Sequence, residues 1–225
     1  MSAEQIPIEV LSDDVSVALR AAEIVVEHAN AAIAARHMFT LAVSGGHTPG
    51  QMFAELARRK DFPWDLSAIY QVDERIAPDG DPNRNLTLLW DNLPEAAFSQ
   101  LHPMPVTAGD LDEAAARYAS AIPECFDLIH LGIGADGHTA SLVPGDPVLD
   151  VADRDVALTG LYMDLRRMTV TYPVLNRARA LLWLVTGKEK RDALSRLQAG
   201  DKSVPAGRVS RAQARIIADA PAVKG

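Results

Sequence analysis

The chain has little cysteine, since Cys125 is the single one among its 225 residues. One cysteine cannot form an intrachain disulfide, and its scarcity favours a reducing, cytoplasmic compartment. Long hydrophobic runs are also absent, because the longest strongly apolar run, 180–185, is far too short to span a bilayer. The N-terminus lacks the basic segment and apolar core of a secretory signal. The sequence therefore predicts neither secretion nor insertion into a membrane.

Positive charge is scarce, with 22 Lys and Arg against 30 Asp and Glu and a formal net charge of -8. Nucleic-acid backbones demand a positive footprint, so this balance disfavours a general nucleic-acid binder. The charge is unevenly spread: residues 1–150 hold 8 Lys and Arg and 23 Asp and Glu, giving -15, whereas residues 151–225 hold 14 and 7, giving +7. A small anionic ligand bound between the two parts would account for this asymmetry. A chance distribution of charges on solvent-exposed helix faces would also account for it.

Familiar cofactor and metal motifs are missing as well. The glycines match neither the Walker phosphate loop nor the dinucleotide-binding fingerprint, and no HExxH or paired-cysteine spacing occurs. Asp136 and His138, together with Asp73, are the one set that can be imagined around a metal. The sequence motifs therefore favour neither a nucleotide nor a metal site.

What the chain does contain is an alternation of apolar runs and helical patterns, with 48% hydrophobic and 23% charged residues. Apolar runs predict strands at 6–11, 39–43, 68–72, 126–131 and 180–186, with weaker extended segments at 104–106, 156–158, 168–171 and 216–217. Helical spacing predicts helices at 13–36, 49–59, 86–92, 111–121, 173–177 and 188–199. This alternation favours a mainly parallel sheet with helices on both faces. Because no repeat or low-complexity linker divides the chain, we expect one α/β domain over residues 1–225.

The most informative segment, 132–139, reads Gly-Ile-Gly-Ala-Asp-Gly-His-Thr and directly follows the predicted strand 126–131. Open α/β proteins bind their ligands at the carboxyl ends of the strands. Asp136 and His138 would form an acid–base pair at this edge, because a histidine titrates near neutrality and can accept and return a proton. The alternative is a glycine-rich turn whose histidine is only a surface or capping residue.

A second glycine segment, 44–49, reads Ser-Gly-Gly-His-Thr-Pro and lies between a predicted strand and a predicted helix. Unpaired N–H groups and the positive end of the helix favour a phosphate there, although a plain turn would look the same. Asp73, Glu74 and Arg75 end the next predicted strand, where carboxylates and a guanidinium can position a sugar and bind an oxyanion, although an ordinary charged loop would look the same. Cations of the C-terminal third would complete a phosphate site if one or two fold back over the glycine loop.

With these residues in hand, the chain resembles the 6-phosphogluconolactonase family, within the broader glucosamine-6-phosphate isomerase-like superfamily. The resemblance runs almost end to end. Six sequence blocks carry it: SGGHTP at 44–49, DER at 73–75, NRN at 83–85, GIGADGHTASL at 132–142, RMT with YPVLNRA between 167 and 178, and GKEKRDAL at 187–194. It implies a modified Rossmann-like α/β domain that hydrolyses 6-phospho-D-glucono-1,5-lactone without a cofactor, in the oxidative pentose phosphate pathway.

The resemblance also implies roles for individual residues. His138 would be the general base for a water that attacks the lactone carbonyl, and Asp136 would orient it or tune its basicity. Asp73 would lie near the sugar hydroxyls. The phosphate would bind to the glycine loop and to three cations: Gly45, Gly46, Thr48, Arg75, Arg167 and Lys190.

Two other functions stay open. Aminosugar-phosphate deaminases of the superfamily carry a glutamate five residues beyond the motif histidine, and Val143 occupies that place here, which disfavours this activity. A sugar-phosphate sensor that binds without turnover would normally need a DNA-binding segment, and neither residues 1–11 nor the C-terminal tail shows a helix-turn-helix pattern. A phosphorylated sugar lactone is therefore the expected partner, without nucleic acid or membrane, and the sequence does not indicate the oligomeric state.

Overall fold

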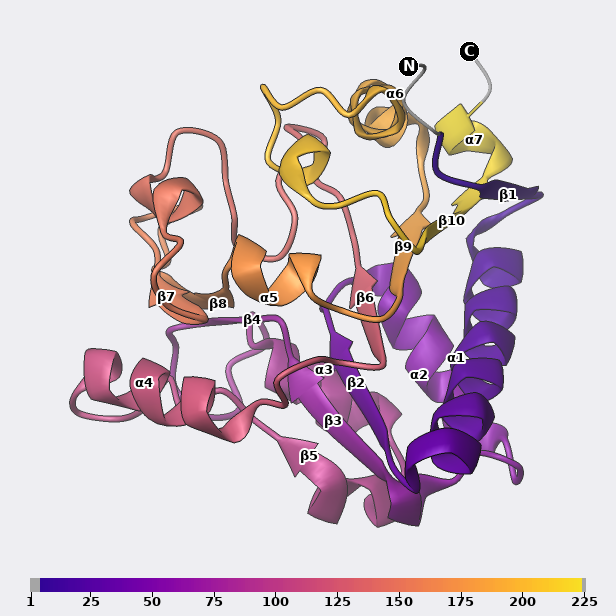
Figure 1. The fold of residues 1–225 in the computed structure, drawn as a ribbon, viewed down its shortest axis with the longest axis horizontal. Coiled ribbons are helices and arrows are strands. Elements are labelled where there is room, and N and C mark those ends of the chain that lie inside the picture. The colour runs from indigo at the N-terminus through magenta and orange to yellow at the C-terminus, as the bar shows by residue number, and fades with distance from the viewer. Residues whose placement is uncertain (1–4, 224–225) are drawn as a thin grey trace.

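Seven short parallel strands form the central sheet of the computed structural model, which describes residues 5–223 (Figure 1). In order across the sheet they are β1 (Ile8–Leu11), β10 (Ala214–Asp219), β9 (Leu181–Val185), β6 (Leu128–Leu131), β2 (Phe39–Val43), β3 (Ser67–Gln71) and β5 (Leu101–His102). The mainly parallel sheet predicted from the alternating strands and helices is confirmed. Residues 1–4 and 224–225 of the expected domain lie outside the described residues.

Helices cover both faces of this sheet, as the sequence predicts (Figure 1). One face carries α1 (Asp14–Arg36), α2 (His47–Arg58) and α3 (Asn85–Asn92). The other carries α4 (Leu111–Ala121), α5 (Tyr172–Asn176) and α6 (Arg191–Ala199). The remaining helices are short, namely α7 (Ala220–Val223) and the 3₁₀ turns at Trp64–Leu66, Glu95–Gln100, Pro147–Asp150, Lys188–Lys190 and Ala206–Arg208.

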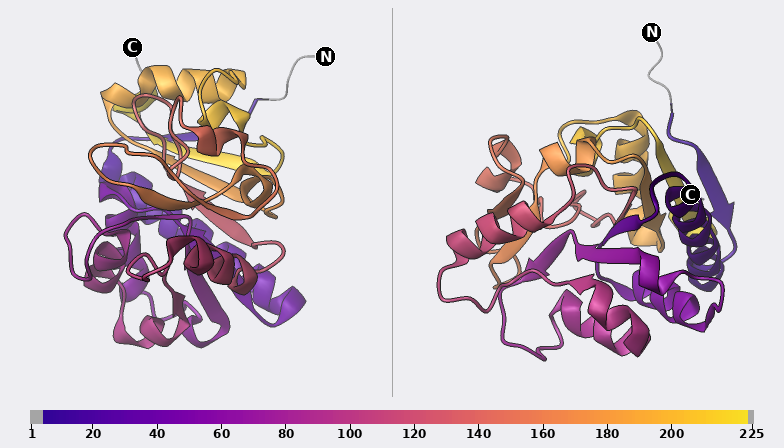
Figure 2. Two further views of the ribbon diagram at one scale, coloured as in Figure 1. Left: turned by 90° about the vertical axis from the view of Figure 1, so that its left-hand side faces the viewer. Right: turned by 60° about the horizontal axis from the view of Figure 1, so that its bottom comes forward.

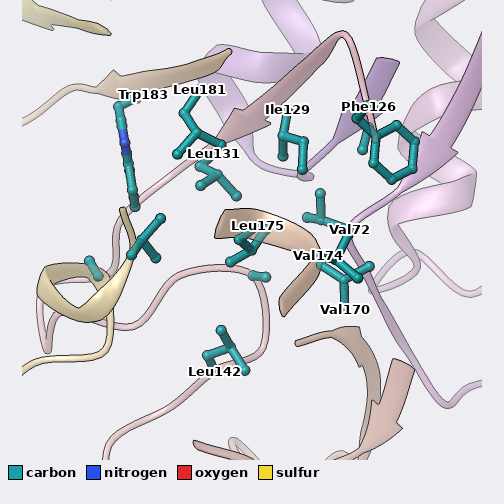
Figure 3. Packing of buried hydrophobic residues seen from close by; sticks show 14 of the residues in the cluster. Val72, Phe126, Ile129, Leu131, Leu142, Val170, Val174, Leu175, Leu181 and Trp183 are labelled. Atoms are coloured by element: carbon teal, nitrogen blue, oxygen red, sulfur yellow. The ribbon is translucent and has the colours of Figure 1, made fainter. Parts of the chain in front are cut away.

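The residues of β9 show how the two apolar layers arise. Leu182 and Leu184 pack into the layer of α1 and α2, whereas Leu181 and Trp183 pack into the layer of α5 and α6. Successive side chains of a strand point to opposite faces, and a parallel strand between two helix layers is shielded from water on both. Figure 3 shows Leu175 of α5 on the same side of the sheet as Leu181 and Trp183. The continuous apolar run in the sequence follows from this double burial.

A second sheet contains the extended segments predicted at 156–158 and 168–171, but the sequence does not predict how they pair. It is antiparallel, in the order β4 (Asp73–Arg75), β8 (Arg167–Val170) and β7 (Val156–Leu158). Figure 2 shows the fold from two further directions. Its buried residues join the apolar cluster on the α5 face of the central sheet. The pairing matters for function, because it brings β4 and β8 together although they are far apart in the sequence.

One predicted strand is wrong. Residues 104–106 form no strand, and the edge strand is instead β5, formed by Leu101–His102. Pro103 and Pro105 have no N–H to donate to a strand neighbour. Met104, between them, donates its N–H to the side-chain Oε1 of Gln71 at 2.8 Å. The other predicted elements are present, with their ends shifted by a few residues.

Candidate functional site

A cleft of about 360 Å³ opens at the carboxyl ends of β2, β6 and β9, where the sequence predicts the ligand site. The loops after these strands line it, together with residues of β4 and β8. Eight of the nine predicted site residues are in this lining: Gly45, Gly46, Thr48, Asp73, Arg75, His138, Arg167 and Lys190. The ninth, Asp136, is hydrogen-bonded to His138. The structure therefore brings the predicted residues together.

His138 and Asp136 form a close pair. His138 Nδ1 lies 2.6 Å from Asp136 Oδ1, and the His138 backbone N–H donates to the same oxygen at 3.1 Å. Burial alone would raise the pKa of the Asp136 carboxyl, but hydrogen bonds and charge from His138 and the Tyr162 hydroxyl lower it overall. A carboxylate only accepts, so Nδ1 carries the proton and Nε2 of the neutral ring keeps its lone pair. This is the arrangement of a base with an orienting carboxylate.

Gly134 allows the pair to lie against the backbone. A Cβ atom at this position would lie 2.0 Å from His138 Nδ1 and 2.5 Å from Asp136 Oδ1. The turn is closed by the Gly134 N–H, which donates to the His138 carbonyl at 2.8 Å, and by the Gly137 N–H, which donates to the Gly134 carbonyl at 2.9 Å. A glycine is required because any side chain would displace the imidazole or the carboxylate.

The glycine loop after β2 presents the N-terminus of α2 to the cleft. Gly46 precedes this 12-residue helix and offers no side-chain cap, so the first backbone N–H groups have no capping partner from it. Their partial positive charge favours an anion. Gly45 lies against Asn85, where a Cβ atom would come within 2.0 Å of Oδ1. Thr48 Oγ1 lies 2.7 Å from Thr186 Oγ1, which joins this loop to the one after β9.

His130 of β6, which is fully buried, supports the glycine loop after β2. The Ser44 N–H donates to His130 Nδ1 at 3.3 Å, and the Ser44 hydroxyl donates to the His130 carbonyl at 3.3 Å. Because Nδ1 accepts, the neutral ring carries its proton on Nε2. Burial lowers the pKa of His130 to about 3, so the ring stays neutral in the folded protein near neutral pH.

We expect His130 to make the fold less stable in mild acid. The unfolded chain takes up a proton on this ring near its ordinary pKa of 6.5, whereas the folded protein resists it down to about 3. The stabilisation is therefore complete above about pH 7 and is lost as the pH falls, by up to about 1.4 kcal/mol per pH unit. Urea unfolding of the wild type and His130→Gln from about pH 7 to about pH 4.5 measures it. A shallower slope for the variant is expected, and equal slopes would contradict the prediction.

Two arginines meet across the second sheet. Arg75 of β4 and Arg167 of β8 are register partners, and the Nε atoms of both are buried without a hydrogen-bond partner among the described residues. Arg75 Nη1 donates to Asn85 Oδ1 at 2.6 Å and to the Asn83 carbonyl at 2.8 Å. Burial, followed by the charge of Arg75, lowers the pKa of Arg167. Arginine nevertheless stays charged at neutral pH, so the two guanidinium groups and Lys190 form a cationic region that suits an anion.

Asp73 lines the cleft with both carboxylate oxygens already bonded. Oδ2 accepts from the Ser141 hydroxyl at 2.6 Å, and Oδ1 accepts from Asn85 Nδ2 at 3.2 Å. These bonds join the start of β4, the start of α3 and the loop that follows His138. Asp73 therefore holds three parts of the cleft wall together.

A buried carboxylate, Glu74, supports the same wall. Its Oε1 accepts the backbone N–H groups of Arg75 and Asn85 at 2.8 Å, and its Oε2 accepts that of Leu86 at 2.8 Å. Arg84 Nε lies 3.0 Å from Oε2, at an angle that makes an ion pair rather than a hydrogen bond. Glu74 thus fixes the backbone of Arg75 and satisfies the first N–H groups of α3.

Sequence reasoning misses four side chains of the site. Asn85, Thr186 and Glu189 line the cleft, and the Tyr162 hydroxyl donates to Asp136 Oδ2 at 3.0 Å. Thr186 and Glu189 follow the end of β9 and could have been found from that position. Asn85 lies in the NRN block but has no predicted role there. Nothing in the local pattern around Tyr162 points to the site.

Two kinds of feature do not occur within residues 5–223. No three side chains of His, Cys, Asp or Glu gather there in a way that would hold a metal ion. None of the helices in this part of the chain combines the length and the apolar character that a bilayer crossing requires.

The chain is similar to known proteins over most of its length. Residues 12–218 match the family model described as "Glucosamine-6-phosphate isomerases/6-phosphogluconolactonase". The chain is 37% identical over 181 residues to a 6-phosphogluconolactonase of Synechocystis sp., covering 75% of both chains, and 30% identical over 205 residues to one of Nostoc sp., covering 85% of both. The crystal structure of 6-phosphogluconolactonase from Thermotoga maritima matches with a TM-score of 0.84 at 25% identity, covering 95% of this chain and 98% of that one. The chain therefore belongs to the glucosamine-6-phosphate isomerase/6-phosphogluconolactonase family.

Proposed function

We propose that the protein hydrolyses 6-phospho-D-glucono-1,5-lactone to 6-phospho-D-gluconate, the second step of the oxidative pentose phosphate pathway. One observation carries the proposal: the same cleft contains a base, His138 with Asp136, and a cationic region of Arg75, Arg167 and Lys190. The relatives at 37% and 30% identity are 6-phosphogluconolactonases. The reaction consumes only water besides the lactone, so it requires no cofactor.

His138 and Asp136 carry out the chemical step. His138 Nε2 takes a proton from a water molecule as the water oxygen forms a bond to the lactone carbonyl carbon. Cations of the cleft or backbone N–H groups stabilise the tetrahedral oxyanion. The bond between the carbonyl carbon and the ring oxygen then breaks, and the ring oxygen receives the proton from His138. Asp136 keeps the imidazole oriented and stabilises its charged form between the two proton transfers.

The glycine loop and the cations bind the phosphate. The loop before α2 offers backbone N–H groups at Gly45 and Gly46, and the first turn of α2 offers that of Thr48. Arg75 and Arg167 add planar, always charged forks, and Lys190 adds a point charge. Asp73 lies in the same lining and would face the sugar hydroxyls. The proposed anion site thus takes Arg75 from the acidic part of the sequence and Arg167 and Lys190 from the basic part.

A deaminase or isomerase is the nearest alternative. The description of the matched family names glucosamine-6-phosphate isomerases beside 6-phosphogluconolactonase. Val143 occupies the place of the glutamate that assists ring opening in the deaminases. It is 4% exposed and is not part of the cleft lining within residues 5–223. An apolar, buried side chain cannot transfer a proton. Asp73 and Glu189 are the acids of the cleft lining within residues 5–223, so whether either can replace the missing glutamate is tested directly by assay.

The function is tested by proton release from freshly generated lactone, with the spontaneous rate of opening subtracted. Ammonia release from glucosamine 6-phosphate is measured in parallel. We expect hydrolysis that depends on protein concentration, and no ammonia. Ammonia release would favour the deaminase, and ligand binding without hydrolysis above background would favour a sensor.

Removal of the phosphate from the substrate should lower kcat/KM by at least about 100-fold. Two or more charge-assisted hydrogen bonds would be lost, and each is worth about 1.5 to 3 kcal/mol. The measurement compares 6-phosphogluconolactone with glucono-1,5-lactone under the same conditions. Equal rates would remove the phosphate role of Arg75, Arg167 and Lys190.

Other features of the protein also remain proposals. We propose a single α/β domain, since both sheets contribute to one apolar cluster. A cytoplasmic compartment and the lack of a nucleic-acid partner stay predictions from the composition.

A further inference from the structure

Tyr162 is the first residue of a tight four-residue turn between β7 and β8, and Leu165 is the last. The Tyr162 N–H donates to the Leu165 carbonyl at 3.0 Å, and the Leu165 N–H donates back at 3.3 Å. Met163 and Asp164 between them have φ values of 49° and 62°, the left-handed region typical of a two-residue hairpin turn. Met163 and Leu161 are each 74% exposed, whereas Tyr162 is partly buried. Of these three neighbours, Tyr162 is the one that reaches the site.

The hydroxyl of Tyr162 contacts the Asp136–His138 pair. It donates to Asp136 Oδ2 at 3.0 Å, while Asp136 Oδ1 accepts from His138. The tyrosine and imidazole rings lie edge to face, with centroids 5.4 Å apart and planes at 63°. Burial and the bond to Asp136 raise the pKa of Tyr162, so the hydroxyl keeps its proton and acts as a donor. Each carboxylate oxygen thus has its own donor, which prevents rotation of the carboxylate plane.

The ring of Tyr162 contacts the cationic region. The guanidinium carbon of Arg167 lies 4.9 Å from the ring centroid, within the range of a cation–π contact. Arg167 is 5% exposed, and Arg75 is its register partner, so a neighbouring π-face compensates part of the cost of burying this charge. One side chain therefore touches both the base pair and the anion site.

We propose that Tyr162 is a positioning residue that acts on two parts of the site, with its hydroxyl fixing Asp136 for His138 and its ring fixing Arg167 for the phosphate. The inference rests on the proposed lactone hydrolysis. It assigns no proton transfer to Tyr162, because the base and its carboxylate are complete without it. It makes the two effects separable by substitution.

Tyr162→Phe removes the hydroxyl and keeps the ring, whereas Tyr162→Leu removes both. We expect Tyr162→Phe to lower kcat about tenfold, the scale of one hydrogen bond to a charged group, with KM changed less than about twofold. Tyr162→Leu should lower kcat similarly and also raise KM by about three- to tenfold, through loss of the contact with Arg167. Tyr172→Phe is the matched control, since that hydroxyl donates to the Pro205 carbonyl at 3.0 Å and Tyr172 is not part of the cleft lining among the described residues.

Coupling to Asp136 separates positioning from a general structural effect. In an Asp136→Ala background the hydroxyl has no carboxylate to fix, so Tyr162→Phe should cause no further loss of kcat. Nitrogen NMR of the His138 ring, without substrate, should show the Nδ1–H form in the wild type and a mixture of tautomers in Tyr162→Phe. The inference is overturned by equal losses in both backgrounds, by a kcat like that of Tyr172→Phe, or by an unchanged tautomer. The NMR result decides the positioning of His138 even if the lactone is not the substrate, and wild-type turnover decides the substrate.

Discussion

Replacing His138 by alanine should lower kcat for lactone hydrolysis by on the order of 10² to 10⁴, with the fold unchanged. His138 Nε2 is the proposed proton acceptor. In the variant, the Asp136 carboxylate is still held by the backbone N–H of residue 138 and by the Tyr162 hydroxyl, so it does not take the position of Nε2. The side chain lines an open cleft rather than the core, so its loss leaves no large cavity. Stopped-flow proton release with excess lactone measures kcat directly.

The control for this experiment is the uncatalysed opening of the lactone, which is subtracted at every concentration. His102→Ala serves as a matched substitution, because His102 is exposed on the edge strand β5 and stacks on Tyr70 outside the cleft. We expect that variant to keep its rate within about twofold. A His138→Ala rate within about tenfold of the wild type would remove His138 from the mechanism.

Glu74→Ala should lower the free energy of unfolding by about 3 to 5 kcal/mol, the usual cost of breaking a buried ion pair from one side. Arg84 would lose its buried counterion and keep only the exposed carboxylate of Asp79. The N–H groups of Asn85 and Leu86 would lose their acceptor. Urea unfolding gives the change in free energy. Because Glu74 also accepts the N–H of Arg75, we expect a rise in KM from any Glu74→Ala that still folds.

Glu113→Ala provides the control for the ion pair at Glu74. Glu113 pairs with Arg117 on α4, where both side chains are more than half exposed, and such surface pairs contribute about 0.2 to 1 kcal/mol. Glu74→Gln keeps an acceptor for part of the network and should fall between the two. A loss below about 1 kcal/mol in Glu74→Ala would show that water replaces the carboxylate at no great cost, which contradicts its buried role.

The central sheet was predictable because each of its main strands is an apolar run shielded on both faces. Even the loops at its carboxyl edge could be identified, since Gly132 directly follows β6 and Gly45 and Gly46 follow β2 after one serine. The edge strand was placed wrongly because Pro103 and Pro105 exclude the segment around Met104 from a ladder, and the short pair Leu101–His102 shows no pattern of its own.

The second sheet could not be predicted, because its order depends on pairings between distant segments. Asp73–Arg75 is predicted only as the end of a strand, whereas it forms β4 and pairs with Arg167–Val170. Local spacing carries no signal for that register. The contact of Tyr162 with Asp136 could not be predicted for a similar reason. It depends on a turn in which Met163 and Asp164 both have positive φ, and a methionine rarely adopts that conformation.

The opposition of Arg75 and Arg167 has a thermodynamic consequence for the unliganded protein. Two like charges held as partners in one short sheet repel each other, and the neighbouring carboxylate of Asp73 offsets only part of that charge. A bound phosphate dianion would then be the missing counterion of the fold itself. Occupancy and unfolding are linked, so the protein should resist denaturation more strongly the more saturated its cleft is with a phosphorylated ligand.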